Sequence, residues 1–391
     1  MGAAVARRGH KIALLGGDGV GPEVLREGRR VLEAVEERYG LDFDLQELAC
    51  GAQLYQKTGR EWAEGAFEFC KEEADAILLG AVGWPGVNLP NGDIAGAGIV
   101  FGLRFGLDLY ANVRPTKLYR GVPHKISNAF QTVWKPENVD FTIIRENTEG
   151  LYAPIRGSLT RGGQEEVAID NNVITHKGAE RVIRRAFELA ERQGGTPADG
   201  KKKVTCIDKA NVLRGSQLFR RVYDVVAKEY PGIERDYAYV DAFTQWMIRN
   251  PESYHVCVTT NMLGDIVTDL ASVLQGGMGM AAGGNIGDEH AMFEPIHGSA
   301  PKYVGQNKVN PVATILSVKM MLEWLGERHD EDKLLRAAQG IETAVQATLD
   351  AGVKTYDLGG EHTCSQVGEA VARHLLQPER APTKRATRGK R

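Results

Sequence analysis

The chain of 391 residues lacks the features that mark several specialised classes of protein. Its five cysteines are odd in number, lie far apart and show no CxxC spacing, which is typical of a reduced cytoplasm rather than a disulfide-bonded secreted protein. No apolar run approaches the length of a membrane span, and the first residues contain no signal-peptide core. A net charge of −3 gives no general attraction to nucleic acid or to an anionic membrane.

What remains is the composition of an ordinary globular protein. Hydrophobic residues make up 42% and charged residues 25% of the chain, so neither disorder nor a coiled coil dominates. The length exceeds that of one compact core and indicates two domains, or one domain interrupted by another. We therefore expect a cytoplasmic protein without a membrane or nucleic-acid partner.

The N-terminal part alternates between strand and helix patterns. Strands are expected at residues 11–15, 42–48 and 76–80, with helices at 23–39 and 62–73 between them. The glycine-rich turn at 16–21 does not satisfy GxGxxG, and no acid follows at the usual distance, so the Rossmann fingerprint is absent. The order predicts an α/β fold with a mostly parallel sheet.

Residues 256–311 contain the densest set of signals. An apolar, β-branched run reads as a buried strand, and the helix after it carries Asp265 and Asp269, four residues apart and therefore on one face. Carboxylates so placed suit Mg²⁺ or Mn²⁺, although a solvated helix face with two acids is the alternative on spacing alone. The glycines clustered at 276–287 predict a loop that faces a ligand.

Two arginines precede this region in apolar surroundings. Arg104 and Arg114 stand ten residues apart, and half-buried guanidinium groups require anions. Near a carboxylate-rich cation site, they indicate a substrate with more than one carboxylate. Structural salt bridges to Asp108 or Asp93 are an equally weighted alternative.

Other chemically active side chains follow predicted strands. Arg145 and Tyr152 come at and after the end of the strand at 141–144, Lys209 follows an apolar strand at 204–208, and Asp241 ends a strand that begins at 237. Strand ends are the usual position for active groups in α/β proteins, and Lys209 is a candidate for tuned chemistry. The irregular, strand-like stretch at 158–174 could be an arm that pairs with another subunit.

Six sequence motifs occur together in a fixed order. GDGVGPEV, DLYANVRP, IIRENTEGLY, DKANVL, TTNMLGDIVTDLAS and FEPIHGSAPKYVGQNKVNP occur in this order. Over residues 11–376 the chain resembles the metal-dependent β-decarboxylating dehydrogenases, the isocitrate and isopropylmalate dehydrogenase family. The resemblance implies an isopropylmalate-dehydrogenase-like two-domain α/β fold, unrelated to the Rossmann fold, with mixed sheets and an active-site cleft between the domains.

The resemblance also implies a division of the chain. Residues 1–110 and 277–377 would form a large cofactor-binding domain. Residues 111–276 would form a small domain for dimerisation, metal and substrate, and 378–391 would be a basic, disordered tail. The implied reaction is the oxidative decarboxylation of a 2-hydroxy acid bearing a 3-carboxylate, with hydride transfer to NAD(P).

Family roles can be carried over to matching positions. Tyr152 and Lys209 would be the catalytic acid and base. The substrate carboxylates would be bound by Arg104, Arg114 and Arg145, and Mg²⁺ or Mn²⁺ by Asp241, Asp265 and Asp269. The family forms a homodimer in which the residues equivalent to Lys209 and Asp241 reach into the site of the partner subunit.

The cofactor region favours NADP over NAD. Lys302 and Tyr303 replace the acid that binds the ribose diol of NAD, and Tyr356 fits a downstream tyrosine of NADP-dependent relatives. Gly360 departs from that pattern because it stands where an arginine is expected. The resemblance places the remaining cofactor-binding residues on the adenosine side: His297, Gly298, Ser299, Ala300 and Asn310.

The substrate's γ-substituent is the least determined feature. Gly98, Val100 and Phe101 stand where the family selects this group, and they indicate an apolar or unusual substituent. Isopropylmalate enzymes also carry a nearby acid, which Ala97 does not supply. The glycine-rich loop at 92–98 could instead present backbone N–H groups to an anion, so malate-like, tartrate-like and phosphonate-bearing substrates stay open.

Two hypotheses that do not involve catalysis have less support from the sequence. A non-catalytic regulatory subunit of the same family would have lost acid, base or metal positions, all of which are present here. The terminal sequence APTKRATRGKR could contact nucleic acid, but without aromatic residues such a tail is more often solvated.

Overall fold

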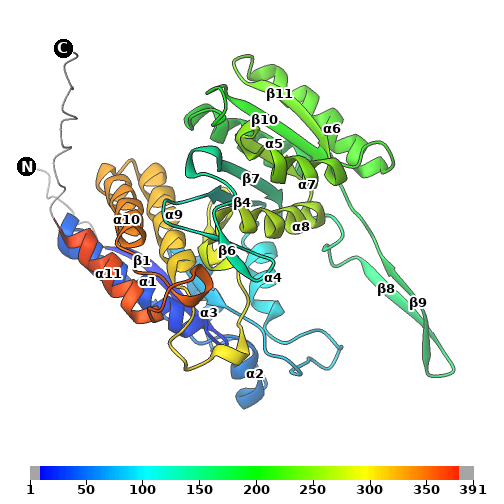
Figure 1. The fold of residues 1–391 in the computed structure, drawn as a ribbon. Coiled ribbons are helices and arrows are strands. Elements are labelled where there is room, and N and C mark those ends of the chain that lie inside the picture. Colours follow the sequence, from blue (N-terminus) through cyan, green and yellow to red (C-terminus); the bar gives the residue numbers. More distant parts are fainter. Residues whose placement is uncertain (1–8, 378–391) are drawn as a thin grey trace, which may run out of the picture.

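The structure, a computed structural model, describes residues 9–377, which form one ten-stranded central sheet flanked by helices (Figure 1). In spatial order its strands are β11 (Glu234–Tyr239), β10 (Lys203–Asp208), β12 (Val256–Thr259), β7 (Asp140–Glu146), β4 (Ala111–Lys117), β13 (Ala282–Ile286), β14 (Ala291–Pro295), β3 (Ala76–Ala81), β1 (His10–Gly17) and β2 (Phe43–Glu47). The predicted α/β class is confirmed.

Strand direction changes in the middle of the sheet. The outer strands pair in parallel, as in β1 with β2 and β3, or β10 with β11 and β12. At the centre, β4 is antiparallel to both β7 and β13, and β13 is antiparallel to β14. The mixed sheet implied by the family resemblance is therefore confirmed. Six of the nine strand pairs in the central sheet are parallel, so the mostly parallel sheet predicted from the N-terminal pattern is also confirmed. The antiparallel centre lies outside that pattern, which covers only β1 to β3.

The helices divide between the two halves of the sheet. Figure 1 shows α1, α9, α10 and α11 packed together beside one half, and α5 and α6 beside the other. Their bounds are α1 (Gly21–Tyr39), α2 (Ala52–Thr58), α3 (Ala66–Glu72), α4 (Ala97–Gly106), α5 (His176–Arg192), α6 (Arg214–Val226), α7 (Val240–Arg249), α8 (Asn261–Ser272), α9 (Val312–His329), α10 (Asp332–Asp350) and α11 (Cys364–Leu376). No helix within residues 9–377 is long and apolar enough to cross a membrane.

The two halves of the sheet come from different parts of the chain. Residues 111–276 supply β4, β7, β10, β11 and β12, whereas β1, β2, β3, β13 and β14 come from the segments before and after. The predicted two-domain division would cut the sheet between β4 and β13, and it stays a prediction. The predicted tail at 378–391 lies outside the described residues.

Local signals explain both ends of α1. Pro22 lies in the first turn of α1, and Gly40 ends that helix with a φ of 60°. The helix predicted at 62–73 begins later, at Ala66, and α2 before it was not predicted. A seven-residue helix between Gly51 and Gly59 is too short to give a helical period.

The glycine-rich stretch at 276–287 corrects one prediction. Its second half is β13, a fully buried strand, and not a ligand-facing loop. A Cβ atom at Gly284 would lie 3.0 Å from the Phe293 ring, and one at Gly283 would lie 3.0 Å from Nε of Arg114. These glycines make room for neighbouring side chains on a central strand.

A long hairpin projects from the body of the molecule (Figure 1). Strands β8 (Arg156–Arg161) and β9 (Gln164–Asp170) pair only with each other, and all of their residues are exposed. The strand-like reading of this stretch is confirmed, and its pairing with a second chain stays a prediction. A second, short hairpin joins β5 (His124–Ile126) to β6 (Ala129–Gln131).

Candidate active site

The central strands β4 and β7 bring two of the predicted arginines to one face of the sheet. Asn112 lies opposite Arg145 and Arg114 opposite Ile143, and opposed residues of an antiparallel pair share a face. Because side chains two apart along β4 also share a face, Arg114 and Arg145 point to the same side. Arg104 reaches this region from α4.

Arg145 is the most deeply buried of the three. Its side chain donates to Oδ1 of Asn261 from Nε at 2.9 Å and from Nη2 at 2.7 Å, and Nη1 forms an ion pair with Asp265. Burial, followed by the charge of Arg104, lowers the pKa of Arg145 to about 10. The guanidinium therefore remains charged at neutral pH, in a place where a further anion would be strongly attracted.

The other two arginines meet polar groups rather than the predicted alternatives. Arg104 donates from Nε to Asn285 at 3.0 Å, and its Nη2 lies 3.4 Å from Glu294. Arg114 donates to Asn112, and burial lowers its pKa while Glu294 opposes that shift. Three buried cations thus share few carboxylates, which is an arrangement suited to an anionic ligand.

The alternative of structural salt bridges to Asp108 or Asp93 is wrong. Asp108 pairs with Arg181 at 2.7 Å, and Asp93 pairs with Arg156 at 3.0 Å. Neither acid reaches Arg104 or Arg114 among the hydrogen bonds and ion pairs of residues 9–377.

Asn285 is an organising residue that the sequence analysis missed. Its side chain is fully buried, and Oδ1 accepts from Asn112 at 2.6 Å, from Arg104 at 3.0 Å and from Asn147 at 3.0 Å. Its amide donates to Glu294 at 2.8 Å. The only signal in the sequence is a polar residue within a glycine-rich run, and that run was read as a loop.

Two of the three predicted metal ligands lie on one helix, and the metal site stays a prediction. Asp265 and Asp269 both lie on α8, and the hydroxyl of Tyr152 donates to Oδ2 of Asp265 at 2.9 Å. Burial and then the charge of Asp265 raise the pKa of Asp269. Asp265 is already paired with Arg145, so Asp269 is the carboxylate whose charge a divalent cation would offset, and carboxylate oxygens suit Mg²⁺ or Mn²⁺.

A third carboxylate does not join them within this chain. No group of three or more His, Cys, Asp or Glu residues in the described part of the chain could hold a metal. Asp241 instead lies in the first turn of α7, where it pairs with Lys209. Carboxylates are the type of ligand that a divalent cation prefers, but the described part of one chain brings only two of the three predicted ligands together.

Lys209 and Asp241 form a separate, solvent-facing pair. The Lys209 ammonium lies 2.5 Å from Oδ1 of Asp241, and the Asp241 side chain is 67% exposed. This hydrogen bond lowers the pKa of Asp241. Within residues 9–377 the pair makes no hydrogen bond or ion pair with Arg145, Tyr152 or Asp265, so the structure divides the predicted catalytic residues into two sets.

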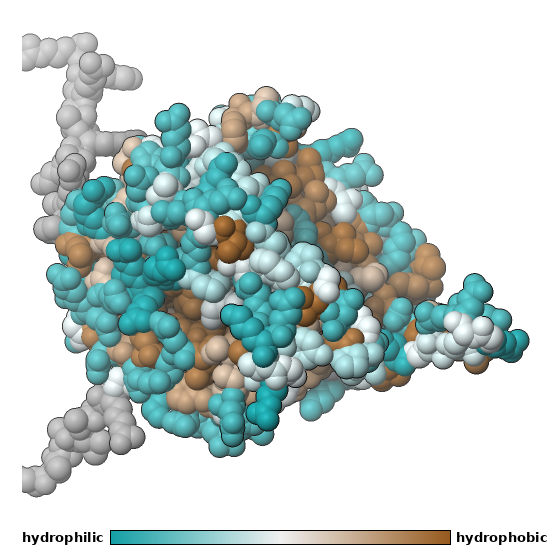
Figure 2. Space-filling model, turned by 90° about the horizontal axis from the view of Figure 1, so that it is seen from below, coloured by the Kyte–Doolittle hydropathy of each residue, from teal (hydrophilic) through white to brown (hydrophobic). Residues whose placement is uncertain are grey.

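Large apolar side chains are exposed on the segments that carry the pair and on α8, which packs against α7. Val212 is 65% exposed, Ile266 on α8 56% and Trp246 on α7 49%. Figure 2 shows hydrophobic side chains gathered on one face of the body, on the side from which the hairpin projects. Exposed apolar patches of this kind often mark protein interfaces.

The N-terminus of α4 lies at the position predicted for the γ-substituent. Val100 is partly buried, and Phe101 is 37% exposed and stacks on Phe105. Beside them, a Cβ atom on Gly98 would lie 2.5 Å from a carboxylate oxygen of Glu61, whose other oxygen accepts from the N–H of Gly96 at 2.5 Å. Glu61 therefore supplies an acid here from a distant loop, which the comparison at Ala97 could not reveal.

The predicted adenosine residues lie in a turn that packs against the first βα unit. The Ser299 carbonyl accepts from the N–H of Val20 at 2.9 Å, and Ala300 has a φ of 39°. His297 bonds the Gly298 carbonyl through Nδ1 at 3.0 Å, while its Nε2 is buried with no partner among the described residues. That free nitrogen leaves a polar contact for a ligand.

A cluster of tyrosines and lysines lies beyond this turn. The rings of Tyr303 and Tyr356 are 5.6 Å apart, Lys302 lies 4.8 Å from the first ring, and Lys308 lies 4.6 Å from the second. The hydrogen bond from Tyr356 lowers the pKa of Tyr303. Lys308 was missed by the sequence analysis, and it adds a cation to a cluster in which Gly360 stands at the position expected for an arginine.

Asn310 adjoins this cluster, and Gly360 stands at the position where an arginine was expected. Asn310 donates to Asp357 at 3.1 Å, next to Tyr356. Gly360 has no room for a side chain, since a Cβ atom there would lie 2.0 Å from the Lys354 carbonyl oxygen. An arginine could not replace this glycine without a shift of the backbone.

Comparisons with known proteins give one consistent result. The family model described as isocitrate/isopropylmalate dehydrogenase matches residues 11–371. A 3-isopropylmalate dehydrogenase of Thermobifida fusca is 42% identical over 94% of this chain and 98% of its own length. A 3-isopropylmalate/3-methylmalate dehydrogenase of Methanocaldococcus jannaschii is 39% identical over 94% of this chain and 99% of its own.

Solved structures agree. An isocitrate dehydrogenase of Methylococcus capsulatus has a TM-score of 0.80 and 35% identity, with 94% of this chain and 100% of that chain covered. A β-decarboxylating dehydrogenase of Thermococcus kodakarensis has a TM-score of 0.72 and 34% identity, with 94% and 96% covered.

Proposed function

Because the chain belongs to the isocitrate/isopropylmalate dehydrogenase family, we propose that it oxidatively decarboxylates a 2-hydroxy acid bearing a 3-carboxylate, with transfer of hydride to NADP. The observation that carries the proposal is the convergence of Arg104, Arg114 and Arg145 beside the helix carboxylates Asp265 and Asp269. This arrangement offers cations for two substrate carboxylates and oxygen donors for a metal.

Substrate binding would exchange protein contacts for substrate contacts. In the structure, Arg145 is held by Asn261 and Asp265, and Arg104 by Asn285 and Glu294. Asn285 and Asn261 fix the guanidinium planes, so that the free N–H groups are already oriented when a dicarboxylate arrives. Preorganised donors of this kind lower the cost of binding and orient the C2–C3 bond.

Proton transfers would involve Tyr152 and Lys209. When bound, the divalent cation would supply positive charge beside the C2 oxygen, and the nicotinamide would accept the hydride. Lys209 would accept the proton of the C2 hydroxyl, directly or through a neighbouring group. Burial and the hydrogen bond to Asp265 raise the pKa of Tyr152, so its phenol keeps a proton that it can donate to C3 after loss of CO₂.

An apolar γ-substituent, as in isopropylmalate, fits the α4 region better than a third carboxylate. Val100 and Phe101 are apolar, and the Glu61 carboxylate already occupies the positive N-terminal end of α4. An additional anion at this position would meet like charge. Malate-like, tartrate-like and phosphonate-bearing substrates are the alternatives within the same chemistry.

NADP is the proposed cofactor. Lys302 and Lys308 offer cations to a 2′-phosphate, and Tyr303 and Tyr356 offer hydroxyl donors. No acid stands at the position expected to bind a ribose diol. Lys308 would supply the charge that the missing arginine does not.

A homodimer is proposed because one chain contains only part of the site. Lys209 and Asp241 lie exposed beside apolar side chains such as Trp246 and Val212. A second copy related by two-fold symmetry would cover that surface and bring its own pair to the arginine cluster. All five cysteines are free and buried, which supports a cytoplasmic location.

The reading as a non-catalytic regulatory subunit has less support. Such a chain would be expected to lack an acid, base or metal ligand. Here Tyr152 contacts Asp265 and Lys209 contacts Asp241, so the groups are present and mutually oriented.

The test is a turnover panel. Reduction of NADP⁺ and of NAD⁺ would be followed with Mn²⁺ or with chelator, using isopropylmalate, isocitrate, homoisocitrate, malate, tartrate and a phosphonate analogue. We expect metal-dependent turnover of isopropylmalate or a close apolar analogue, with NADP⁺ preferred. Silence across the panel, from protein that also binds neither metal nor dinucleotide, would overturn the proposal and favour the regulatory reading.

A further inference from the structure

The reverse face of β4 and β7 carries a second cavity that the proposed reaction does not use. Its volume is about 720 Å³. Val113 lies opposite Ile144 and Lys117 opposite Asp140, and these side chains alternate with those that face the arginine cluster. The cavity and the arginine cluster are therefore separated by the thickness of the sheet. We call the cavity the rear crevice.

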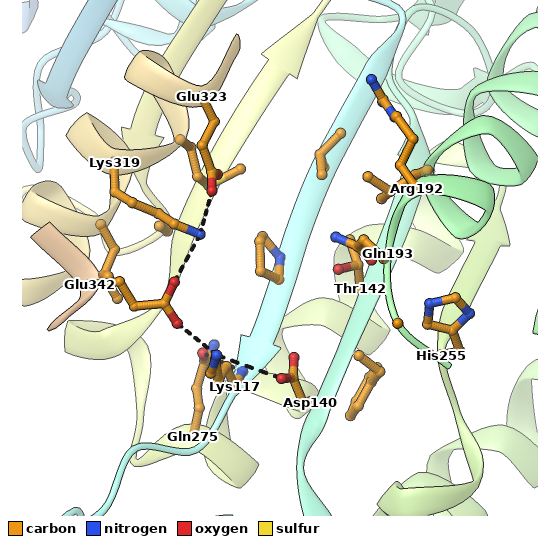
Figure 3. A pocket seen from close by; sticks show the side chains of 18 of the residues that line it. Lys117, Asp140, Thr142, Arg192, Gln193, His255, Gln275, Lys319, Glu323 and Glu342 are labelled. Atoms are coloured by element: carbon orange, nitrogen blue, oxygen red, sulfur yellow. Dashed lines mark hydrogen bonds and ion pairs between the residues drawn. The ribbon is translucent and has the colours of Figure 1, made fainter. Parts of the chain in front are cut away.

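The rear crevice lies between the two halves of the molecule. Figure 3 shows Lys319, Glu323 and Glu342 along one side and Arg192 and Gln193 along the other. The first three belong to α9 and α10, and the last two lie at the end of α5. A volume within roughly 300 to 1,000 Å³ is typical of small-molecule sites.

The floor of the rear crevice is apolar. Val113 and Ile144 come from β4 and β7, Phe293 from β14, and Met320 and Trp324 from α9. Each of these side chains is at least nine-tenths buried. Val113, Met320 and Trp324 keep 8%, 9% and 8% of their surface exposed, and a ligand on this floor would cover that apolar surface.

The side along α9 and α10 carries a chain of alternating charges, which Figure 3 traces by dashed lines. Lys319 lies 2.9 Å from Glu323 and 3.3 Å from Glu342. Lys117 lies 2.6 Å from the same Glu342 and 3.6 Å from Asp140. The chain therefore begins and ends with a carboxylate, and two ammonium groups serve three acids.

The two terminal carboxylates are the incompletely neutralised groups. Glu342, with a cation on each side, has its pKa lowered by Lys319 and Lys117 against the effect of burial. Among the ion pairs of the described residues, Glu323 contacts only Lys319 and Asp140 contacts only Lys117. Each terminal carboxylate therefore has a single cation in contact, because two ammonium groups are shared among three acids. The Glu323 and Asp140 side chains are 41% and 61% exposed, so both carboxylates are accessible to a ligand.

The remaining charges of the crevice do not change this balance. Arg192 pairs with Glu327 at 2.7 Å, and this ion pair joins α5 to α9 across the crevice. Arg185 and Glu137 also line it, one of each sign. The excess is therefore one negative charge, located in the alternating chain.

We propose that the rear crevice binds a small organic cation, a protonated primary amine on a compact aromatic or aliphatic body. The ammonium group would donate to a terminal carboxylate of the charge chain, and the apolar body would lie on the floor formed by β4, β7 and α9. An anionic ligand of the same shape would meet the excess negative charge and bind less well. The site is distinct from that of the substrate because it opens on the other face of the sheet.

The experiment is a calorimetric titration of the full chain with three matched probes. Naphthylmethylamine carries the proposed cation, and naphthylmethanol and naphthoate keep the ring with a neutral or an anionic head. We expect saturable binding of one amine per chain, at least tenfold tighter than either control. Saturating hydroxy acid and NADP⁺ should leave the amine affinity unchanged, since they bind on the other face.

Variants locate the site. Glu323→Gln and Asp140→Asn should each weaken amine binding at least fivefold. Glu229→Gln, which removes an exposed acid paired with Arg184, should leave it unchanged. Asp140 is largely exposed, so Asp140→Asn should fold normally and keeps the test valid if Glu323→Gln does not.

Several results would overturn the proposal: no saturable amine binding, equal affinity for naphthoate, unchanged affinity in folded variants at both acids, or displacement by the hydroxy acid. None of them depends on turnover. The rear crevice and the proposed function can therefore fail separately.

Discussion

Two sets of predicted site residues lie in contrasting environments. Arg104, Arg114 and Arg145 are at most 7% exposed, and Asn285 and Asn261 fix two of them in place. Lys209 and Asp241 lie at the surface and bond to each other. The buried set is held by its own fold, whereas the exposed pair has no further structural support from the described chain.

The difference indicates what each set does for stability and for activity. A buried charge left without its partner is costly, so the fold depends on the buried set. An exposed ion pair contributes little to stability, so the fold should not depend on this pair. We propose that the pair acts in catalysis in a neighbouring subunit.

The largest expected effect comes from Asp265, the partly exposed partner of the buried Arg145. Asp265→Asn should lower kcat/KM by about 10⁴-fold, because one change removes a metal-binding oxygen and weakens the contacts to Arg145 and Tyr152. It should also lower the free energy of unfolding by about 1 to 3 kcal/mol. Steady-state kinetics and urea denaturation measure both effects. Normal stability with lost activity would show that Arg145 does not need this carboxylate.

The exposed pair should give the opposite combination. Lys209→Met should lower kcat by about 10³-fold, through loss of an acid–base group, and leave the urea midpoint unchanged. Lys201→Met is the matched control, because Lys201 is an exposed lysine that pairs with Asp199. Turnover of Lys209→Met near that of the wild type would show that Lys209 is not needed for catalysis.

The proposed cofactor site contains an exposed lysine, Lys308. Lys308 is exposed and held over the Tyr356 ring, so its replacement should not affect folding. Lys308→Met should reduce the preference for NADP⁺ over NAD⁺ by about tenfold, because a charged contact to phosphate is lost. The ratio of kcat/KM values measures the preference. An equal loss with both cofactors would place Lys308 elsewhere in the mechanism.

The smallest effect is expected at the C-terminus. Removal of residues 378–391 should leave turnover within about twofold, since basic tails of this composition are usually solvated. A large loss would mean that the tail contributes to the active assembly.

The sequence could predict those features that depend on short-range patterns. Strand and helix periods located Arg145, Tyr152 and Lys209 near strand ends and placed Asp265 and Asp269 on one helix. The apolar surroundings of Arg104 and Arg114 correctly indicated burial. Each of these inferences needs only neighbours within a few residues.

The rest depends on contacts between distant segments. Asn285 contacts Arg104 across 181 positions in the chain, and Glu61 approaches Gly96 across 35. The strand β13 was read as a loop because its glycines serve the packing of Phe293 and Arg114, which lie on other strands. No local pattern reports such contacts.

A subunit-complementation assay tests the central claim, that each active site combines the buried set of one chain with the exposed pair of another. Lys209→Met and Tyr152→Phe chains would be denatured, mixed in equal amounts and refolded together, with each variant refolded alone as a control. Random pairing should give mixed dimers with one intact site each, and so about a quarter of wild-type turnover. Turnover no higher than the mean of the two separate variants would contradict the claim.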